Sequence, residues 1–125
     1  MSTVLLVGED ELLQQTRAAV LRRTGAGAVC SSASSALAVQ QDSQCDVVIL
    51  CHSLPESLSA TLASTIHSRW PQTRILQLTS ARLWETTVAE TGADAISSSD
   101  PEQLILHTAD LLSRPVAAAE KPVSN

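Results

Sequence analysis

The tripeptide Cys51-His52-Ser53 places a thiol, an imidazole and a hydroxyl directly after the apolar run Asp46 to Leu50. These groups can act as nucleophile, proton carrier or metal ligand. The run has the length and composition of a buried parallel strand, and Pro55 closes the segment behind it. In an open α/β sheet, binding and chemistry take place just beyond the carboxyl ends of the strands. The sequence therefore places Cys51 where such a fold keeps its functional site.

The three cysteines, Cys30, Cys45 and Cys51, are odd in number and show no zinc-ligand spacing. We interpret them as buried, reduced thiols. His52 has no partner histidine or cysteine at ligand spacing either, so we place it in a loop at the top of the sheet. No metal site is predicted.

Strand and helix patterns alternate along the chain. The segments with strand character are Thr3 to Val7, Ala26 to Cys30, Asp46 to Leu50, Arg74 to Thr79 and Asp94 to Ser97. The helical segments begin at Gly8 to Glu11, Ala36, Ser57, Leu83 and Asp100. The first is predicted to stop at Gly25 and the third to present Leu58, Leu62, Ile66 and Trp70 on one face. This order requires parallel strands joined by right-handed crossovers, the arrangement of an α/β domain.

Length and composition indicate one globular domain with an aliphatic core. The chain has 125 residues, of which 44% are hydrophobic, 17% charged and only 2% aromatic. A formal net charge of -5 disfavours binding to nucleic acid or to an anionic membrane. No apolar run reaches membrane-spanning length, so we expect a cytoplasmic protein. We assign residues 1–113 to the domain and 114–125 to a flexible tail or linker.

Four pieces of the sequence carry a family resemblance. They are Val4 to Val7 before acidic residues, Asp46 to Leu50 followed by Leu54-Pro55, Leu78-Thr79-Ser80, and Gly92 to Ala95. In this order and spacing the chain resembles the receiver domain of two-component (phosphorelay) response regulators, over Thr3 to Ser113. The resemblance implies the flavodoxin-like fold, a doubly wound (βα)5 parallel five-stranded sheet with strand order 2-1-3-4-5.

The resemblance also implies a phosphorylation site that this sequence carries only in part. In receivers an aspartate at the end of the third strand accepts the phosphoryl group, and that position falls on Cys51. The acidic pair that helps to hold Mg²⁺ falls on Gly8 and Glu9, which leaves one acid with Asp10 as its neighbour. Mg²⁺ requires near-octahedral oxygen ligands, so we expect its binding to be weak or absent.

The remaining positions of the site match less well. The switch hydroxyl falls on Thr79 and agrees with the family, whereas the lysine falls on Ser99 and the switch aromatic on Ile96. Receivers commonly use the face made by their fourth helix, fifth strand and fifth helix for dimerisation and partner binding, which makes Ile96 and Trp84 candidate interface residues. Trp84 falls near the start of the fourth helix and is, with equal weight, a core residue or an interface anchor.

These departures favour a pseudo-receiver, a protein-interaction module that has lost conventional aspartyl phosphorylation. Its expected partners are a histidine kinase, an output domain or another regulator. Formation of a homodimer is a further alternative. One alternative makes Cys51 a redox or otherwise reactive switch. Another places a small ligand in the depleted pocket, where Thr79, Ser80 and Ser97 to Ser99 supply hydroxyls. An enzyme is the competing class, but no phosphate-binding glycine loop, nucleophile elbow or acid pair with a base is present.

Overall fold

The computed structural model describes residues 2–43, 45–52, 54–79, 93–98 and 100–113 of the chain. The strands are β1 (Thr3–Val7), β2 (Gly27–Ser31), β3 (Val47–Leu50), β4 (Arg74–Thr79) and β5 (Ala95–Ser98). The helices are α1 (Glu11–Arg22), α2 (Ala36–Ser43), α3 (Glu56–Arg69) and α5 (Pro101–Ser113). The helix expected at Leu83 to Glu90, with Trp84, and the tail 114–125 lie outside the described residues.

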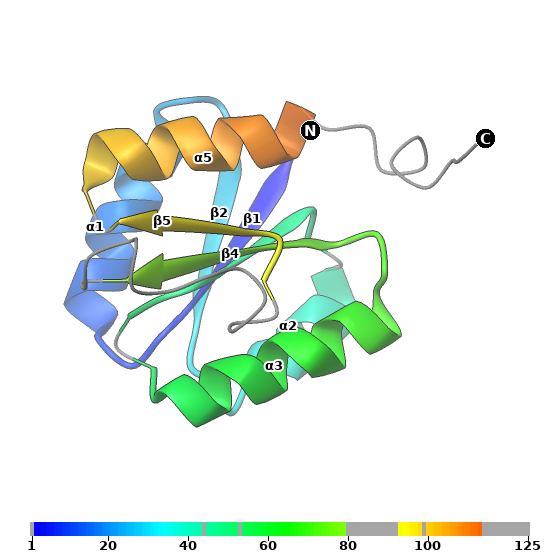
Figure 1. Ribbon diagram of the computed structural model, residues 1–125. Coiled ribbons are helices and arrows are strands. Elements are labelled where there is room, and N and C mark those ends of the chain that lie inside the picture. The colour runs from blue at the N-terminus through cyan, green and yellow to red at the C-terminus, as the bar shows by residue number, and fades with distance from the viewer. Residues whose placement is uncertain (1, 44, 53, 80–92, 99, 114–125) are drawn as a thin grey trace.

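The five strands form one parallel sheet in the order β2-β1-β3-β4-β5. This confirms the fold and the strand order expected from the sequence. Figure 1 shows α1 and α5 on one face of the sheet and α2 and α3 on the other. Successive βα units therefore wind to both faces, and the order reverses between β1 and β3.

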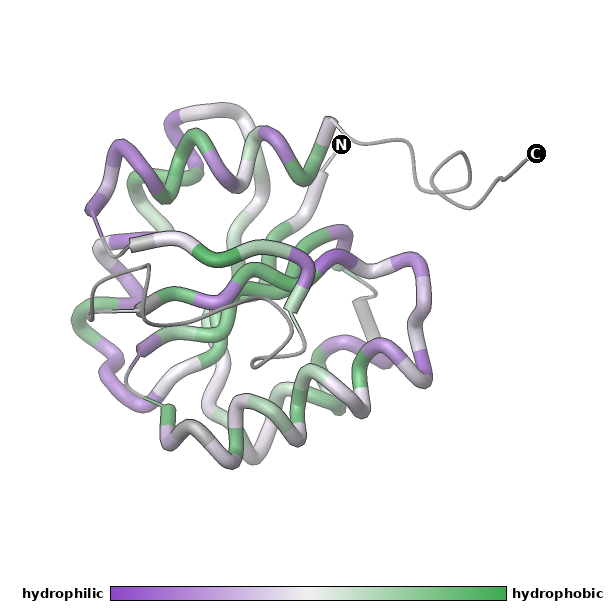
Figure 2. Tube along the Cα trace, viewed as in Figure 1, coloured by the Kyte–Doolittle hydropathy of each residue, from purple (hydrophilic) through white to green (hydrophobic). Residues whose placement is uncertain are grey.

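The core consists of two aliphatic layers, one on each face of the sheet. Because side chains alternate along a strand, neighbouring residues in β3 belong to different layers. Ile49 joins Leu21 of α1 and Leu104 of α5 on one side, whereas Val48 joins Ile66 of α3 on the other. Figure 2 shows this as hydrophobic strands enclosed by helices with mixed faces. No helix among the described residues is long and apolar enough to cross a membrane.

Helix ends follow the sequence signals at three positions and depart from them at one. Asp10 caps α1 by accepting a hydrogen bond from the Leu13 amide, and Asp100 does the same for Gln103 at α5. Gly25 has a φ of 97°, the left-handed conformation expected of the residue that stops α1. The prediction that Ser57 caps α3 is wrong.

Helix α3 starts at Glu56, directly after Pro55, which provides no side-chain cap. Proline has a fixed φ that suits a helix start, so Ser57 is already inside the first turn and its carbonyl accepts from Thr61. The predicted inner face of this helix is confirmed, because four apolar residues at a spacing of four pack against the core layer. They are Leu58, Leu62, Ile66 and Trp70.

A buried polar network fixes the amino edge of the sheet. The Gln40 amide donates to the Thr73 hydroxyl at 2.7 Å and accepts from the Cys45 amide at 3.0 Å. Thr73 in turn donates to the Cys45 carbonyl at 3.1 Å. Gln40, Thr73 and Cys45 are almost fully buried, so direct buried hydrogen bonds tie α2 to the two connections that enter β3 and β4.

Candidate functional site

The carboxyl edge of the sheet brings the predicted phosphorylation-site positions on β1 and β3 side by side. Val7 is paired with Leu50, and the Cys51 amide continues the ladder by donating to the Val7 carbonyl at 2.8 Å. The Cys51 carbonyl accepts from Leu54 at 3.1 Å, which turns the chain away from the sheet. Cys51 therefore stands beside Gly8, the residue after β1.

The Cys51 side chain points into the core rather than into solvent. It is 1% exposed and belongs to the layer under α1 and α5. Burial raises the pKa of the Cys51 thiol above its ordinary value; a charge interaction and a hydrogen bond from Arg17 oppose this shift, and Asp10 adds to it. Desolvation is the largest cause of this shift, and the Asp10 carboxylate is a smaller one. Cys51 is an uncharged thiol at neutral pH.

Arg17 is a residue of this site that the sequence analysis missed. It lies on the inner face of α1, is only 7% exposed, and its guanidinium approaches Nδ1 of His52 at 3.3 Å. Its position could have been read from the helical spacing, because the buried residues of α1 are Gln14, Arg17, Ala18 and Leu21. A cation is therefore present at the acceptor position, although the family lysine is absent.

Gln14 is a second missed residue on the same helix face. Its amide nitrogen donates to the Leu6 carbonyl at 3.0 Å and to the Ser31 carbonyl at 2.8 Å, and its side chain is buried. The bond to Ser31 ties α1 to the end of β2, and the bond to Leu6 ties it to β1. Gln14 and Arg17 therefore position α1 over the carboxyl ends of three strands.

The two acids after β1 serve local structure. Glu9 accepts a hydrogen bond from the Ala33 amide at 3.1 Å, in the loop that follows β2. Asp10 is the cap of α1 described above. Within the part of the chain that the structure describes, no group of three or more His, Cys, Asp and Glu residues is arranged to hold a metal ion.

A groove lies at the carboxyl ends of β1 and β2, against the start of α1. Its volume is about 280 Å³, and Cys51 is not among the residues that line it. The lining residues are Gly8, Glu9, Glu11, Gln14, Cys30, Ser31 and Ser32. Burial raises the pKa of the Cys30 thiol, with Glu11 adding to the shift and Arg22 opposing it. The groove lining carries two carboxylates, those of Glu9 and Glu11.

The β4 and β5 side of the site is described in part. Thr79 ends β4 and its backbone pairs with Ser98, so it stands at the carboxyl edge as predicted. Ile96 pairs with Gln77 and is half-buried. Ser99 and Trp84 lie outside the described residues.

Gln77, which the sequence analysis did not single out, is the polar side chain that β4 directs into the protein. Its amide nitrogen donates to the Leu50 carbonyl at 3.2 Å and to the Leu78 carbonyl at 2.8 Å. The first of these bonds reaches the last residue of β3. Gln77 therefore ties β4 to the end of β3, the strand that Cys51 follows.

Comparison with known proteins finds similarity at the level of structure. Neither a protein-family model nor a curated protein sequence matches the chain. Among solved structures, the chemotaxis response regulator CheY4 of Vibrio cholerae is 23% identical with a TM-score of 0.77, over 89% of this chain and 98% of that one. The signal receiver domain of an HD domain-containing protein from Pseudomonas fluorescens is 23% identical with a TM-score of 0.78, over 97% and 93%.

A third similar structure contains a protein partner. The response regulator TrrA, solved in complex with the histidine kinase ThkA, is 20% identical to this chain with a TM-score of 0.77. The match covers 90% of this chain and all of TrrA. The three similarities cover most of both chains, so this chain has the receiver fold expected from its sequence.

Proposed function

We propose that this chain is a receiver-like module of two-component signalling that acts through protein contacts and without aspartyl phosphorylation. The observation that carries the proposal is the buried thiol of Cys51 at the end of β3, where a receiver needs a carboxylate. A thiol cannot form the acyl phosphate on which receiver switching depends. The fold supports a signalling role, and the altered site removes its usual input.

The donor set around Cys51 does not suit Mg²⁺. The metal takes oxygen ligands in octahedral geometry, usually from more than one carboxylate. Here Gly8 offers no side chain, Glu9 turns to the Ala33 amide, and Asp10 caps α1. Without bound Mg²⁺ and the family lysine, only the buried Arg17 would offset the charge of a transferring phosphoryl group among the described residues, and the reaction would lack most of the neutralisation that it requires. We therefore expect weak Mg²⁺ binding at most.

The proposed partners are proteins of the same signalling system. TrrA was solved with a histidine kinase, and the Pseudomonas fluorescens receiver is part of an HD domain-containing protein. By analogy, we propose a histidine kinase, an output domain or another regulator as the partner of this chain, with self-association as a further possibility. We do not propose an enzymatic activity.

The geometry does not favour the alternative that makes Cys51 a redox switch. A reactive cysteine needs an exposed thiol with a lowered pKa, whereas burial raises that of Cys51. Cys30 lies on β2 and pairs with Leu6 of β1. Strand β1 therefore separates Cys30 from β3, which precedes Cys51. Two strand spacings of about 4.8 Å exceed the Cα separation that a disulfide spans. An internal Cys30–Cys51 disulfide is thereby excluded in this fold.

Intact-mass measurement after incubation with acetyl phosphate and Mg²⁺ tests the proposal. We expect no mass gain for the wild-type chain at neutral pH. A gain of one phosphoryl group that maps to Ser53, Glu9 or Asp10 would overturn the phosphorylation-independent mechanism. The same treatment of a receiver with an intact acceptor aspartate provides the positive control.

A further inference from the structure

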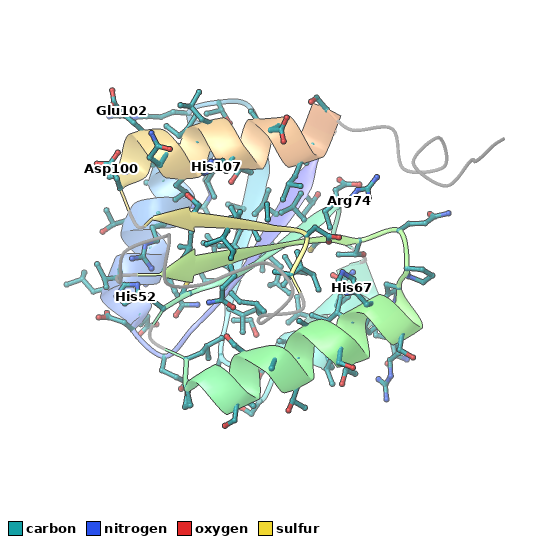
Figure 3. All side chains as sticks on the ribbon, viewed as in Figure 1. His52, His67, Arg74, Asp100, Glu102 and His107 are labelled. Carbon is teal, nitrogen blue, oxygen red and sulfur yellow. The ribbon has the colours of Figure 1, made fainter. Side chains whose placement is uncertain are left out.

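The contact between Arg17 and His52 joins α1 to the segment that leaves β3. The guanidinium nitrogen and Nδ1 of the imidazole are 3.3 Å apart. Arg17 is almost fully buried, whereas His52 is half-buried. Figure 3 shows His52 at the carboxyl edge of the sheet, beside α1. The contact thus connects the interior of the domain to the residue next to Cys51.

The chemistry of the two side chains fixes the direction of this hydrogen bond. A guanidinium carries only donors and remains protonated in proteins. Nδ1 of His52 must therefore be the acceptor, so the imidazole is neutral and carries its hydrogen on Nε2. Protonated imidazole is a donor at both nitrogens and has no acceptor to offer.

The surrounding charges do not neutralise Arg17 directly. Among the described residues no carboxylate lies within ion-pair distance of its guanidinium, and the Cys51 thiol beside it is uncharged at neutral pH. Asp10, which caps α1, and Cys30 on β2 also act electrostatically on Cys51. Asp100 and Glu102 begin α5 at the same end of the sheet.

Protonation of His52 would place a second cation 3.3 Å from a buried guanidinium and remove the acceptor of its hydrogen bond. Like charges at this separation repel strongly in a partly buried environment. Arg17 is held within the packed face of α1, whereas the imidazole is the less buried partner of the contact. The contact should therefore open on the His52 side.

We propose that the Arg17–His52 contact is a proton-sensitive latch, closed while His52 is neutral and released when His52 binds a proton. Release frees the segment after Cys51 from α1, at the edge of the sheet where receivers respond to phosphorylation. This inference goes beyond the proposed function, because it supplies an input that needs neither an acceptor aspartate nor Mg²⁺. Histidine is suited to it since its charge changes between about pH 5 and 8.

Nuclear magnetic resonance of the full chain between pH 8 and pH 5 tests the latch. Long-range proton–nitrogen spectra of the three histidines should show His52 at pH 8 with its hydrogen on Nε2. On acidification, the amide signals of Cys51, Leu54 and the inner face of α1 should shift together with the His52 ring. A hydrogen on Nδ1 at pH 8, or titration of the ring without shifts in α1, would overturn the proposal.

Two variants distinguish the latch from general acid effects. His52→Asn keeps an acceptor oxygen near the position of Nδ1 but cannot titrate, so the α1 shifts should be lost. His67→Gln, on α3 at the other edge of the sheet, removes a different histidine and should leave the α1 shifts unchanged. Persistence of the α1 shifts in His52→Asn, or their loss in His67→Gln, would contradict the assignment. Because neither residue is fully buried, both variants should fold.

Discussion

The guanidinium of Arg17 acts electrostatically on the buried thiol of Cys51, at the position where a receiver carries its acceptor carboxylate, and its charge opposes the rise in the thiol pKa that burial causes. This pairing gives the site a cation on its inner side, from α1. In receivers the cation is a lysine at the end of the fifth strand, and that position falls on Ser99 in this sequence. A carboxylate restored at position 51 would therefore meet a different electrostatic environment from that of an intact receiver.

The Cys51→Asp variant should form an ion pair with Arg17 and should not regain a phosphoryl switch, because Gly8 and Ser99 still lack the acid and the lysine. In that background, Arg17→Met would leave a buried carboxylate unpaired and cost about 3 to 5 kcal/mol of unfolding free energy. Urea denaturation of the single and double variants measures the cost. Equal stability of Cys51→Asp with and without Arg17 would show that the two side chains do not interact.

Alkaline pH should destabilise the domain through its buried thiols. Burial raises the pKa of Cys51 and of Cys45 in the folded state, so folding favours their protonated forms. The resulting stability is complete below the thiol pKa of the unfolded chain, about 8.5, and is lost as the pH rises above it. Denaturant unfolding measures the unfolding free energy at pH 7.5 and pH 10. The decrease between these two pH values should be smaller for Cys51→Ala than for the wild type. An unchanged loss in this variant would contradict the role of Cys51.

The Gln40 network should be important for stability although it is remote from the site. Gln40→Ala removes buried side-chain volume, leaves the Cys45 amide without its acceptor and takes away the donor to the Thr73 hydroxyl, which should cost about 2 to 4 kcal/mol. Gln41→Ala, on the exposed side of the same helix, is the matched control and should change stability little. Thermal or urea unfolding would compare the stabilities of the two variants. Similar losses of unfolding free energy in both would argue against a stabilising role of the network.

The Asp10 carboxylate should act as a helix cap rather than a metal ligand. Asp10→Ala should lower the unfolding free energy by about 1 kcal/mol, and Asp10→Ser, which retains a capping oxygen, should restore most of it. Calorimetric Mg²⁺ titrations of the three proteins should give the same weak or absent heat. Binding in the wild type that Asp10→Ser abolishes would assign the carboxylate to a metal site.

The sequence predicted the strands and helix ends that are determined by residues close to them in the chain. Thr3–Val7 and Arg74–Thr79 are strands with the predicted boundaries, because continuous apolar runs and clear breakers define them. The other three strands are each shifted by one residue at one or both ends, where pairing with a neighbour decides the boundary. Ser57 was misassigned as a cap because the preceding proline already suits a helix start.

The contacts of the site depend on the packing of distant segments and could not be read from the sequence in the same way. The position of Cys51 followed from the strand order. The turn of Glu9 toward Ala33 joins residues 24 apart, and the bond from Arg17 to His52 joins residues 35 apart. Helical spacing placed Arg17 on an inner face, but only the packing of α1 against β3 shows which group it meets.

The most direct test of the central claim is an amide resonance titration of the wild-type chain with Mg²⁺ and then beryllofluoride, followed at Glu9, Cys51 and Thr79. Beryllofluoride mimics a phosphoryl group on an acceptor carboxylate, so a module that works without phosphorylation should show no saturable shifts at these residues. Saturable shifts that spread from Cys51 through the sheet would contradict the account, because they would mean that the site still senses a phosphoryl group.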